Sequence, residues 1–261
     1  MGRGLLLNLG YLLNLGVTPY SDAWELQRSL AAAVSQGAIP AIVVLLEHPP
    51  TVTVGRRTGE AELHLPAGVE AEIVETDRGG KSTYHAPGQL VCYPILDLNH
   101  HGRDVKKYCR DLEEAVIRTT AGVGVEGIRI DGLTGVWVDD PPRKIASIGV
   151  HVSRWITTHG YALNVDLDPA PFTEWITACG LDDAAFTTLA RELDQPISVD
   201  EVRPHAAAAI AGVFGLVLEE LPAADGVGLW PQPVHQKVSA TPIRAVRSGD
   251  AVGVEQVSAR S

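Results

Sequence analysis

Apolar positions recur along this chain at two spacings, one typical of helices and one typical of strands. Helical spacing predicts a first helix over 22–37, which opens with Asp22 and Glu25 placed as a capping pair. The same spacing predicts a second helix over 104–122. A Ser-x-x-Glu capping box predicts the start of a third, Ala-rich helix over 198–214. Each helix is expected to bury one apolar stripe.

Short apolar or alternating runs bounded by Gly and Pro indicate the strands. They lie at 5–13, where one or two strands are expected, and at 41–46, 51–54, 90–93, 135–138, 145–152 and 161–165. Pro94 is expected to close the run at 90–93. The last three runs are too closely spaced for helical crossovers and indicate a meander. Strands and helices in this order predict an α+β fold, in which helices pack on a β-sheet.

The pattern ends near Pro222. A chain of 261 residues is long enough to bury one substantial core. Beyond Pro222, Gly, Pro, Ser and Ala alternate with scattered charges, and no period is sustained to the last residue. We therefore expect residues 1–221 to form a single catalytic domain and residues 222–261 to form a flexible, disordered C-terminal tail.

Charge and composition exclude several classes of protein. The net charge is −11, from 21 Lys and Arg against 32 Asp and Glu, which argues against a nucleic-acid partner. No apolar run approaches the ~20 residues that span a bilayer, so no membrane association is expected. Three cysteines, an odd number, do not make a disulfide scaffold. A reducing, cytoplasmic compartment is the expectation.

A glycine-paired turn next to polar side chains lies at 78–89. Its Gly80-Lys81-Ser82 imitates the end of a phosphate-binding loop, but that loop needs a glycine where this chain has Glu75. A nucleotide site is therefore not expected here. Two interpretations remain, a loop whose backbone approaches a ligand closely and a polar loop between strands.

The cysteines and one lysine are the other candidates for chemistry. Lys144 begins an alternating strand, where it is either solvated or turned inward and paired. Cys92 in an apolar strand and Cys109 beside the buried stripe of a helix are expected to be ordinary buried thiols. Cys179 is predicted to lie in a turn between small residues, and it is the cysteine most open to a substrate. The nine histidines show no metal-ligand spacing, so no metal site is predicted.

These segments together resemble the motifs of the octanoyl-protein transferase family, the LipB-type lipoyl (octanoyl) transferases. The resemblance covers about residues 4–215 and is carried, in order, by Tyr20 with Ala23-Trp24 and Gln27, Glu47–Pro50, Gly55-Arg56, Arg78–His85, Pro87–Val91, Tyr93-Pro94, Gly135–Trp137, Lys144–Gly149, His159-Gly160, Ala162–Asn164 and Cys179-Gly180. Two positions depart from the family pattern. Ala86 stands where Gly is usual, and Ala178 stands where Pro is usual.

The resemblance implies an acyltransferase that moves an octanoyl group from octanoyl-acyl carrier protein to a specific lysine of lipoyl domains, the first step of endogenous protein lipoylation. It implies Cys179 as the nucleophile that carries the acyl group as a thioester, and Lys144 as the group that lowers its pKa and exchanges protons. The acceptors would be lipoyl domains of 2-oxoacid dehydrogenase E2 subunits and the glycine cleavage H protein. No cofactor is expected. The implied fold is a mixed sheet with flanking helices, similar to the catalytic domain of biotin and lipoate protein ligases.

By the same match, the substrate would be bound by three groups of residues. They are Arg78, Gly79, Gly80, Lys81, Ser82, Thr83, Tyr84 and His85; Ser147, Ile148 and Gly149; and Gly160, Tyr161 and Ala162. Small residues among them would leave room for an eight-carbon chain between strands.

A cysteine–lysine pair has a physical rationale of its own. A free cysteine of pKa about 8.5 is only about 3% thiolate at pH 7, and an ammonium that lowers this pKa by ~2 makes it roughly three-quarters thiolate. An acceptor lysine must lose a proton before it attacks. A buried lysine can take that proton, so Cys179 and Lys144 would titrate as a coupled pair.

Three alternatives stay open from the sequence. A lipoate-ligase-like enzyme on the same fold would use ATP, a binding module would hold acyl carrier or lipoyl domains without catalysis, and a cysteine hydrolase would use water. The acidic body would repel an acidic carrier protein, so docking needs a local basic surface. The candidates are Arg56, Arg57, Arg103, Lys106, Lys107 and Arg110.

Overall fold

The computed structural model describes residues 9–59, 63–66, 68–176 and 185–222, together with the backbone of 243–248 and 251–256. The main sheet has nine strands. Its order is β12 (Val217–Leu221), β1 (Leu9–Val17), β2 (Ile42–Glu47), β6 (Gln89–Ile95), β10 (Ile156–Asn164), β9 (Arg143–Ser153), β8 (Leu133–Val138) and β7 (Ile128–Ile130), with β11 (Ala185–Phe186) beside β9. Strand β1 is parallel to both of its neighbours, whereas β6, β10, β9, β8 and β7 pair antiparallel, so the predicted mixed sheet is confirmed.

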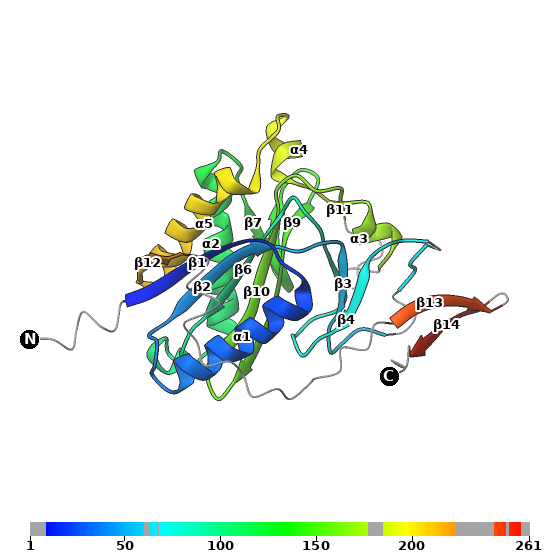
Figure 1. Ribbon diagram of the computed structural model, residues 1–261. Coiled ribbons are helices and arrows are strands. Elements are labelled where there is room, and N and C mark those ends of the chain that lie inside the picture. The colour runs from blue at the N-terminus through cyan, green and yellow to red at the C-terminus, as the bar shows by residue number, and fades with distance from the viewer. Residues whose placement is uncertain are drawn as a thin grey trace, which may run out of the picture.

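Three long helices cover the two faces of this sheet (Figure 1). Helix α1 (Tyr20–Ser35) packs on one face, and helices α2 (Val105–Gly122) and α5 (Val199–Phe214) pack side by side on the other. Strand β2 shows the reason in its sequence. Val43 and Leu45 point to the α2–α5 side, and Ile42 and Val44 point to the α1 side. Both faces are buried, which explains an unbroken apolar run.

A smaller sheet lies at the edge of this body. Its strand order is β4 (Glu72–Glu75), β3 (Thr51–Val54) and β5 (Thr83–His85). The short helices are the 3₁₀ turn η2 (Leu98–His100), α3 (Pro171–Glu174) and α4 (Leu189–Leu193). The loop between β4 and β5 holds the glycine pair at 79–80, so the small sheet presents this loop to the strands of the main sheet.

The predicted helix starts are right for two helices and wrong for one. Asp104 caps α2 by accepting from the backbone N–H of Lys107, and the capping box of α5 has both of its hydrogen bonds. Helix α1 begins at Tyr20, after Pro19 and without a side-chain cap. Asp22 therefore lies inside the first turn, where its charge favours the helix dipole, and does not cap it.

Strand β6 does not stop at Pro94 as predicted. On the side of β2 the strand continues through Pro94, which lies opposite Val43. On the side of β10 regular pairing ends at Cys92, and the Thr157 hydroxyl bridges the gap by donating to Pro94 O at 2.7 Å and accepting from Leu96 N at 2.9 Å. The Thr157 side chain thus satisfies the Pro94 carbonyl and the Leu96 N–H where the regular pairing with β10 has ended.

The C-terminal segment contains two strands that the sequence did not predict. Strand β13 (Ile243–Ser248) pairs antiparallel with β14 (Ala251–Gln256). The expectation that no regular element follows Pro222 is therefore wrong for 243–248 and 251–256. The division into a domain of residues 1–221 and a tail of residues 222–261 stays a prediction.

Candidate active site

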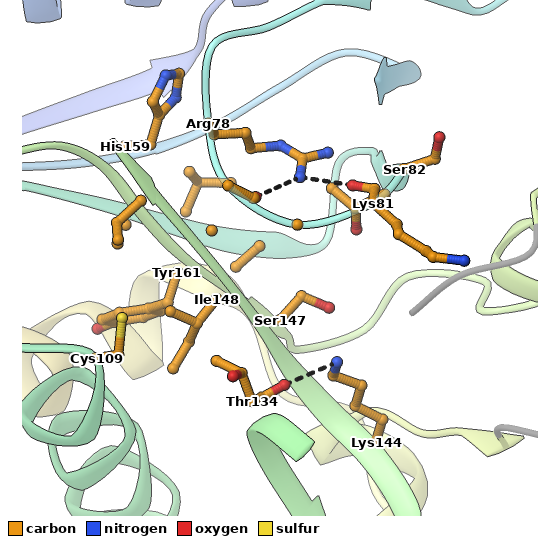
Figure 2. Close-up of a pocket in the computed structure, with 18 of the residues that line it drawn as sticks. Arg78, Lys81, Ser82, Cys109, Thr134, Lys144, Ser147, Ile148, His159 and Tyr161 are labelled. Atoms are coloured by element: carbon orange, nitrogen blue, oxygen red, sulfur yellow. Dashed lines mark hydrogen bonds between the residues drawn. The ribbon is translucent and has the colours of Figure 1, made fainter. Parts of the chain in front are cut away.

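A cavity of about 440 Å³ lies between the glycine-paired loop and the main sheet. Its walls come from α1, α2, the loop before β5, the turn between β7 and β8, and strands β6, β9 and β10. Figure 2 shows Arg78 and His159 at one end of the residues drawn, and Lys144 with Thr134 at the other. Segments that are far apart in the sequence therefore meet at one site.

The structure brings together thirteen of the fourteen residues predicted to bind substrate. The cavity is lined by Arg78, Gly79, Gly80, Lys81, Ser82, Thr83 and His85, by Ser147, Ile148 and Gly149, and by Gly160, Tyr161 and Ala162. Tyr84 is the exception. Its ring packs against Phe172 and Trp175, with centroid distances of 5.8 and 5.1 Å, because alternate residues of strand β5 face opposite sides.

Lys144 lines the same cavity and is turned inward. The residue is 3% exposed, and Nζ donates to Thr134 O at 3.2 Å. Nζ also lies 5.4 Å from the ring centre of Trp137, within the range of a cation–π contact. Of the two alternatives left by the sequence, solvated or inward and paired, the structure shows the second.

Glycine at position 135 makes this lysine possible. A Cβ on Gly135 would lie 2.7 Å from Lys144 Cε and 2.7 Å from Ala146 O, and its φ is +132°. No larger residue fits while the lysine chain runs over this backbone. Strand β11 flanks the lysine on its other edge, where Phe186 pairs with Lys144 and Thr187 N donates to Lys144 O at 3.0 Å.

Arg78 is the second buried cation of the cavity, and it holds the glycine-paired loop in place. The residue is 6% exposed. Its guanidinium donates to Thr53 O at 2.8 Å, to Thr53 Oγ1 at 2.7 Å, to Gly79 O at 3.2 Å and to Lys81 O at 2.7 Å. The close approach needs glycine directly after strand β3, because a Cβ on Gly55 would lie 2.5 Å from Gly80 O. Arg78 therefore clamps the loop to strand β3.

A chain of side-chain hydrogen bonds links this loop to the strand beside Lys144. His85 Nδ1 donates to Gln89 Oε1 at 2.7 Å, Gln89 Nε2 donates to Asn164 Oδ1 at 3.0 Å, and Asn164 Nδ2 donates to Thr187 O at 3.0 Å. Burial lowers the pKa of His85 well below its usual value. A neutral ring with its proton on Nδ1 fits these partners.

His159 forms a second network, which sequence reasoning did not assign. The residue has a φ of +57° in the middle of strand β10, a strained conformation for a non-glycine residue. Its backbone N–H donates to Gln27 Oε1 at 2.6 Å, Nε2 donates to Asp77 Oδ1 at 2.8 Å, and Nδ1 accepts from the Tyr20 hydroxyl at 3.2 Å. The available signal was Gln27, a polar residue on the buried stripe of a helix.

The ionisation of this network is set by burial and by pairing. Burial lowers the pKa of His159, although the hydrogen bond to Asp77 opposes the shift. Burial works to raise the pKa of Asp77, but the bond from His159 and the nearby His151 outweigh it and lower that pKa. A neutral imidazole that donates to an ionised carboxylate satisfies both directions.

His48 lies behind the cavity in a third set of bonds. The ring Nδ1 donates to Thr18 O at 2.7 Å, and Nε2 accepts from the hydroxyl of Tyr93, which lines the cavity, at 2.7 Å. Burial lowers the pKa of His48 from 6.5 to about 4, although the bond to Thr18 opposes this. His48 therefore stays neutral at pH 7, and its Nε2 holds the hydroxyl of Tyr93 in place.

Comparison with known proteins identifies the chain. Its sequence matches the lipoyl protein ligase A/B catalytic domain family over residues 19–211. The octanoyltransferase of Chloroflexus aurantiacus is 49% identical, over 77% of this chain and 92% of its own. The octanoyltransferase of Mycobacterium tuberculosis is 48% identical, over 78% of this chain and 86% of its own. The chain belongs to the octanoyltransferase family. It is an acyltransferase.

Solved structures confirm the predicted fold. A putative lipoate protein ligase from Thermoplasma acidophilum is similar with a TM-score of 0.65 and 16% identity, covering 85% of this chain and 92% of that one. A lipoate-protein ligase A bound with ATP is similar with a TM-score of 0.64 and 17% identity, over the same shares of both chains. The mixed sheet and its flanking helices are thus those of the lipoate ligase fold.

The cysteines of this octanoyltransferase-family chain fall into three situations. Cys92 is buried in the core, where burial raises the pKa of its thiol to about 12, and the expectation of an ordinary buried thiol is confirmed. Cys109 is half-buried and lines the cavity, so it is not the fully buried thiol that was expected. Burial raises its pKa as well. Cys179 lies outside the described residues.

The structure shows the backbone at one of the two positions that depart from the family pattern. Ala86 is buried and does not have a positive φ, so its backbone conformation is open to any residue. Ala178 lies outside the described residues. The family's usual glycine is therefore not required at position 86 by the backbone of this chain.

The described part of the chain shows neither a metal cluster nor a membrane-spanning helix. Within residues 9–59, 63–66, 68–176 and 185–222, no three or more His, Cys, Asp or Glu side chains are grouped so that they could hold a metal ion. Among the helices that the structure describes, none combines the length and the apolar character needed to cross a membrane.

Proposed function

We propose that this protein transfers an octanoyl group from octanoyl-acyl carrier protein to a specific lysine of lipoyl domains through a thioester on Cys179. The observation that carries the proposal is Lys144, a lysine buried at the wall of an acyl-sized cavity in a member of the octanoyltransferase family. The acceptors would be the lipoyl domains of 2-oxoacid dehydrogenases and the glycine cleavage H protein. The reaction needs no cofactor, and its donor and acceptors place it in the cytoplasm.

The first half-reaction loads the enzyme. The Cys179 thiolate attacks the thioester carbonyl of the donor, the new thioester forms as the old carbon–sulfur bond breaks, and the carrier protein leaves as a thiol that takes its proton from the Lys144 ammonium. The ammonium of Lys144 would favour the thiolate before the attack. The described residues support this role, because Nζ sits in a buried site where charge interactions are screened less than in water.

The second half-reaction unloads it. The acceptor lysine attacks the thioester on Cys179, an amide bond forms, and the Cys179 thiolate is released. The attacking amine must lose a proton, and a neutral Lys144 would accept it. A lysine suits both steps because it changes its protonation state, whereas an arginine in its place would not.

The walls of the cavity suit an aliphatic chain. Val91, Ile148, Val150 and Tyr161 provide apolar surface, and glycines leave the space open. A Cβ on Gly149 would lie 3.1 Å from both Arg78 Cδ and Gly79 O. At ~0.8 kcal/mol per buried CH₂, such walls distinguish chain lengths by a few fold per carbon.

A basic surface beside the cavity supports docking of an acidic carrier protein. Arg57 is exposed and lines the cavity. Cys109 places one side of α2 at the cavity wall, and Lys106 and Arg110 lie on exposed positions of the same helix. Lys107 and Arg110 are partly neutralised by Asp111 and Glu113, with contacts of 2.6 and 2.8 Å. We propose that the donor docks over this surface.

A two-stage mass measurement tests the proposal. The protein is incubated with octanoyl-acyl carrier protein without ATP, its intact mass is measured, and apo lipoyl domain is then added. We expect an octanoyl adduct that disappears as the lipoyl domain gains the same mass. Cys179→Ala should give no adduct and no transfer, whereas Cys109→Ser, which removes the other thiol at the cavity, should give both.

The alternatives give other outcomes. An ATP-dependent ligase would modify the lipoyl domain only with free octanoate and ATP, and a binding module would do neither. A hydrolase would release octanoate without modifying the lipoyl domain. Transfer by Cys179→Ala at the wild-type rate would contradict the thioester mechanism.

A further inference from the structure

The peptide between Thr134 and Gly135 is hydrogen-bonded on both of its sides. Its carbonyl, Thr134 O, accepts from Lys144 Nζ at 3.2 Å. Its N–H, on Gly135, donates to Glu113 Oε1 at 3.1 Å. A carboxylate on helix α2 and an ammonium on strand β9 are thus joined through one amide group of strand β8.

Glu113 is unusual among the acids of the described residues because it is 1% exposed. Its second oxygen, Oε2, accepts from Arg110 Nη1 at 2.8 Å and from Arg129 Nε at 3.2 Å. These two arginines bind Oε2, so Oε1 is left to accept from the peptide. The Oε1 atom of this buried carboxylate therefore binds the same peptide that Lys144 contacts.

This connection has a definite physical effect. A hydrogen bond to a charged acceptor is shorter and stronger than one between neutral groups. It also polarises the amide, so the Thr134 carbonyl becomes a better acceptor for an ammonium. The geometry leaves little freedom, because the lysine chain runs over Gly135, where a Cβ would lie 3.2 Å from Nζ.

We propose that Glu113 is a positioning residue for Lys144, acting through the Thr134–Gly135 peptide. Its carboxylate holds this peptide in the orientation that receives Nζ, and its charge favours the ammonium form of the lysine. Glu113 does not touch the substrate. The inference rests on the proposed function, because it gives Glu113 a part in the reaction only if Lys144 exchanges protons there.

Other ionisable groups surround Lys144 and the cavity, and they remain in place in the test below. They are Tyr20 of α1, His85 of β5, Tyr93 of β6, Cys109 of α2, Arg143 of β9, His159 and Tyr161 of β10, Glu192 of α4, and Arg57, Arg78 and Lys81 of the loops, together with Cys179 in the proposed mechanism. Arg143 and Glu192 form an ion pair of 3.0 Å. Because these groups are common to the variants, a difference between the variants reports Glu113.

The test compares Glu113→Gln with Glu114→Gln. Glu114 is the neighbouring acid on α2, and its carboxylate binds Arg118 at 3.0 Å and Arg129 at 2.7 Å. It therefore shares an arginine with Glu113 but not the bond to the Thr134–Gly135 peptide. The rate of octanoyl adduct formation is measured by intact mass between pH 6 and pH 10. Loss of the Lys144 proton should limit this rate at high pH.

We expect Glu113→Gln to move the alkaline limb of this profile, its fall in rate at high pH, to lower pH and to slow adduct formation about tenfold at pH 8. Glu114→Gln should leave both within about twofold. If Glu113 had only a structural role, Glu113→Gln would lower the melting temperature without moving the alkaline limb of the pH profile. An unmoved limb in Glu113→Gln would overturn the inference.

A second pair of variants tests the inference if Glu113→Gln does not fold. The amide nitrogen that this substitution introduces would face Arg110 and Arg129, so the substitution is repeated in an Arg129→Gln background. The limb should again move to lower pH between Arg129→Gln and the double variant, and equal profiles would contradict the inference. If the wild-type protein forms no adduct at all, the proposed function is wrong and the inference falls with it.

Discussion

Two buried cations at opposite ends of one cavity have different surroundings. Arg78 is bonded to the backbone and hydroxyl of Thr53 and to the carbonyls of Gly79 and Lys81. Lys144 runs over a glycine, faces a tryptophan ring and donates to one end of a peptide whose other end is bonded to Glu113. Both residues were predicted to belong to the site, Arg78 for substrate binding and Lys144 for catalysis. Their contacts in the structure differ in kind.

The difference between the contacts of Arg78 and Lys144 matches the chemistry of their side chains. A guanidinium keeps its proton at any physiological pH and offers five donors in a fixed plane, which suits it to hold the loop and strand β3 together. An ammonium offers a point charge and can lose its proton, which suits it to chemistry. Arg78 therefore builds the loop, and Lys144 is placed to act.

The largest expected effect is that of Lys144→Met on activity. Met keeps the length of the side chain and removes the charge and the exchangeable proton. We expect octanoyl transfer to fall by about 10³-fold, as expected for loss of an acid–base group. The free energy of unfolding should change by no more than about 1 kcal/mol, because an apolar chain replaces a buried charge. Steady-state transfer and urea unfolding measure the two quantities.

A Lys144→Met protein that kept transfer within tenfold of the wild type would contradict the difference drawn between the two cations. So would a loss of several kcal/mol in the free energy of unfolding, because Lys144 would then be a structural residue like Arg78.

Arg78→Met should reverse this balance. It leaves the buried carbonyls of Thr53, Gly79 and Lys81 without their donor. We expect the free energy of unfolding to fall by about 3 kcal/mol. The matched control is Arg57→Met, which removes an exposed arginine from the same cavity and should change it by less than about 0.5 kcal/mol. Urea unfolding at pH 7 checks both, and equal stability of the two variants would refute the clamp.

The smallest effect concerns the neutral histidines behind the cavity. The pKa of His48 is lowered from 6.5 to about 4, so the unfolded chain binds a proton at a higher pH than the folded one. The stability from this group is present above pH 6.5 and is lost as the pH falls through 4. Between pH 7 and pH 5 it should contribute a loss of about 2 kcal/mol.

His48→Gln removes that loss and can keep both hydrogen bonds. The free energy of unfolding of the wild type and the variant is measured at pH 7 and pH 5. The wild type should lose about 2 kcal/mol more than the variant over this interval. His85 and His159 are present in both proteins, so the effect of burial on these two rings is common to both, and only the lowering of the His85 pKa by the charge of His48 is lost in the variant. The same pH dependence in both would show that His48 is not held neutral.

Much of the fold could be predicted from spacing, and the exceptions have local causes. The caps at Asp104 and Ser198 follow from side chains that bond their own helix. Helix α1 begins after Pro19 without a side-chain cap, so the capping pattern at Asp22 misplaced its start. The passage of β6 through Pro94 involves a partner elsewhere in the chain, Thr157. A local pattern cannot contain a partner that is distant in the sequence.

The same limit separates the predicted site from the observed one. Motif resemblance identified the lining residues, yet it grouped Tyr84 with them although that ring faces the opposite side of β5. It did not assign Glu113 or Asp77, because one is a helix acid among many and the other gains its meaning from His159. The clamp that Arg78 forms between the loop and Thr53 likewise became visible only through its contacts.

The most direct test of the central claim is the location of the acyl group on the enzyme. The protein is incubated with octanoyl-acyl carrier protein alone, quenched in acid, digested, and its cysteine peptides are sequenced by mass spectrometry. We predict an octanoyl thioester on Cys179, absent from Cys92 and Cys109, and lost when apo lipoyl domain is added before the quench. An unmodified Cys179 in a protein that still transfers octanoate would contradict the account.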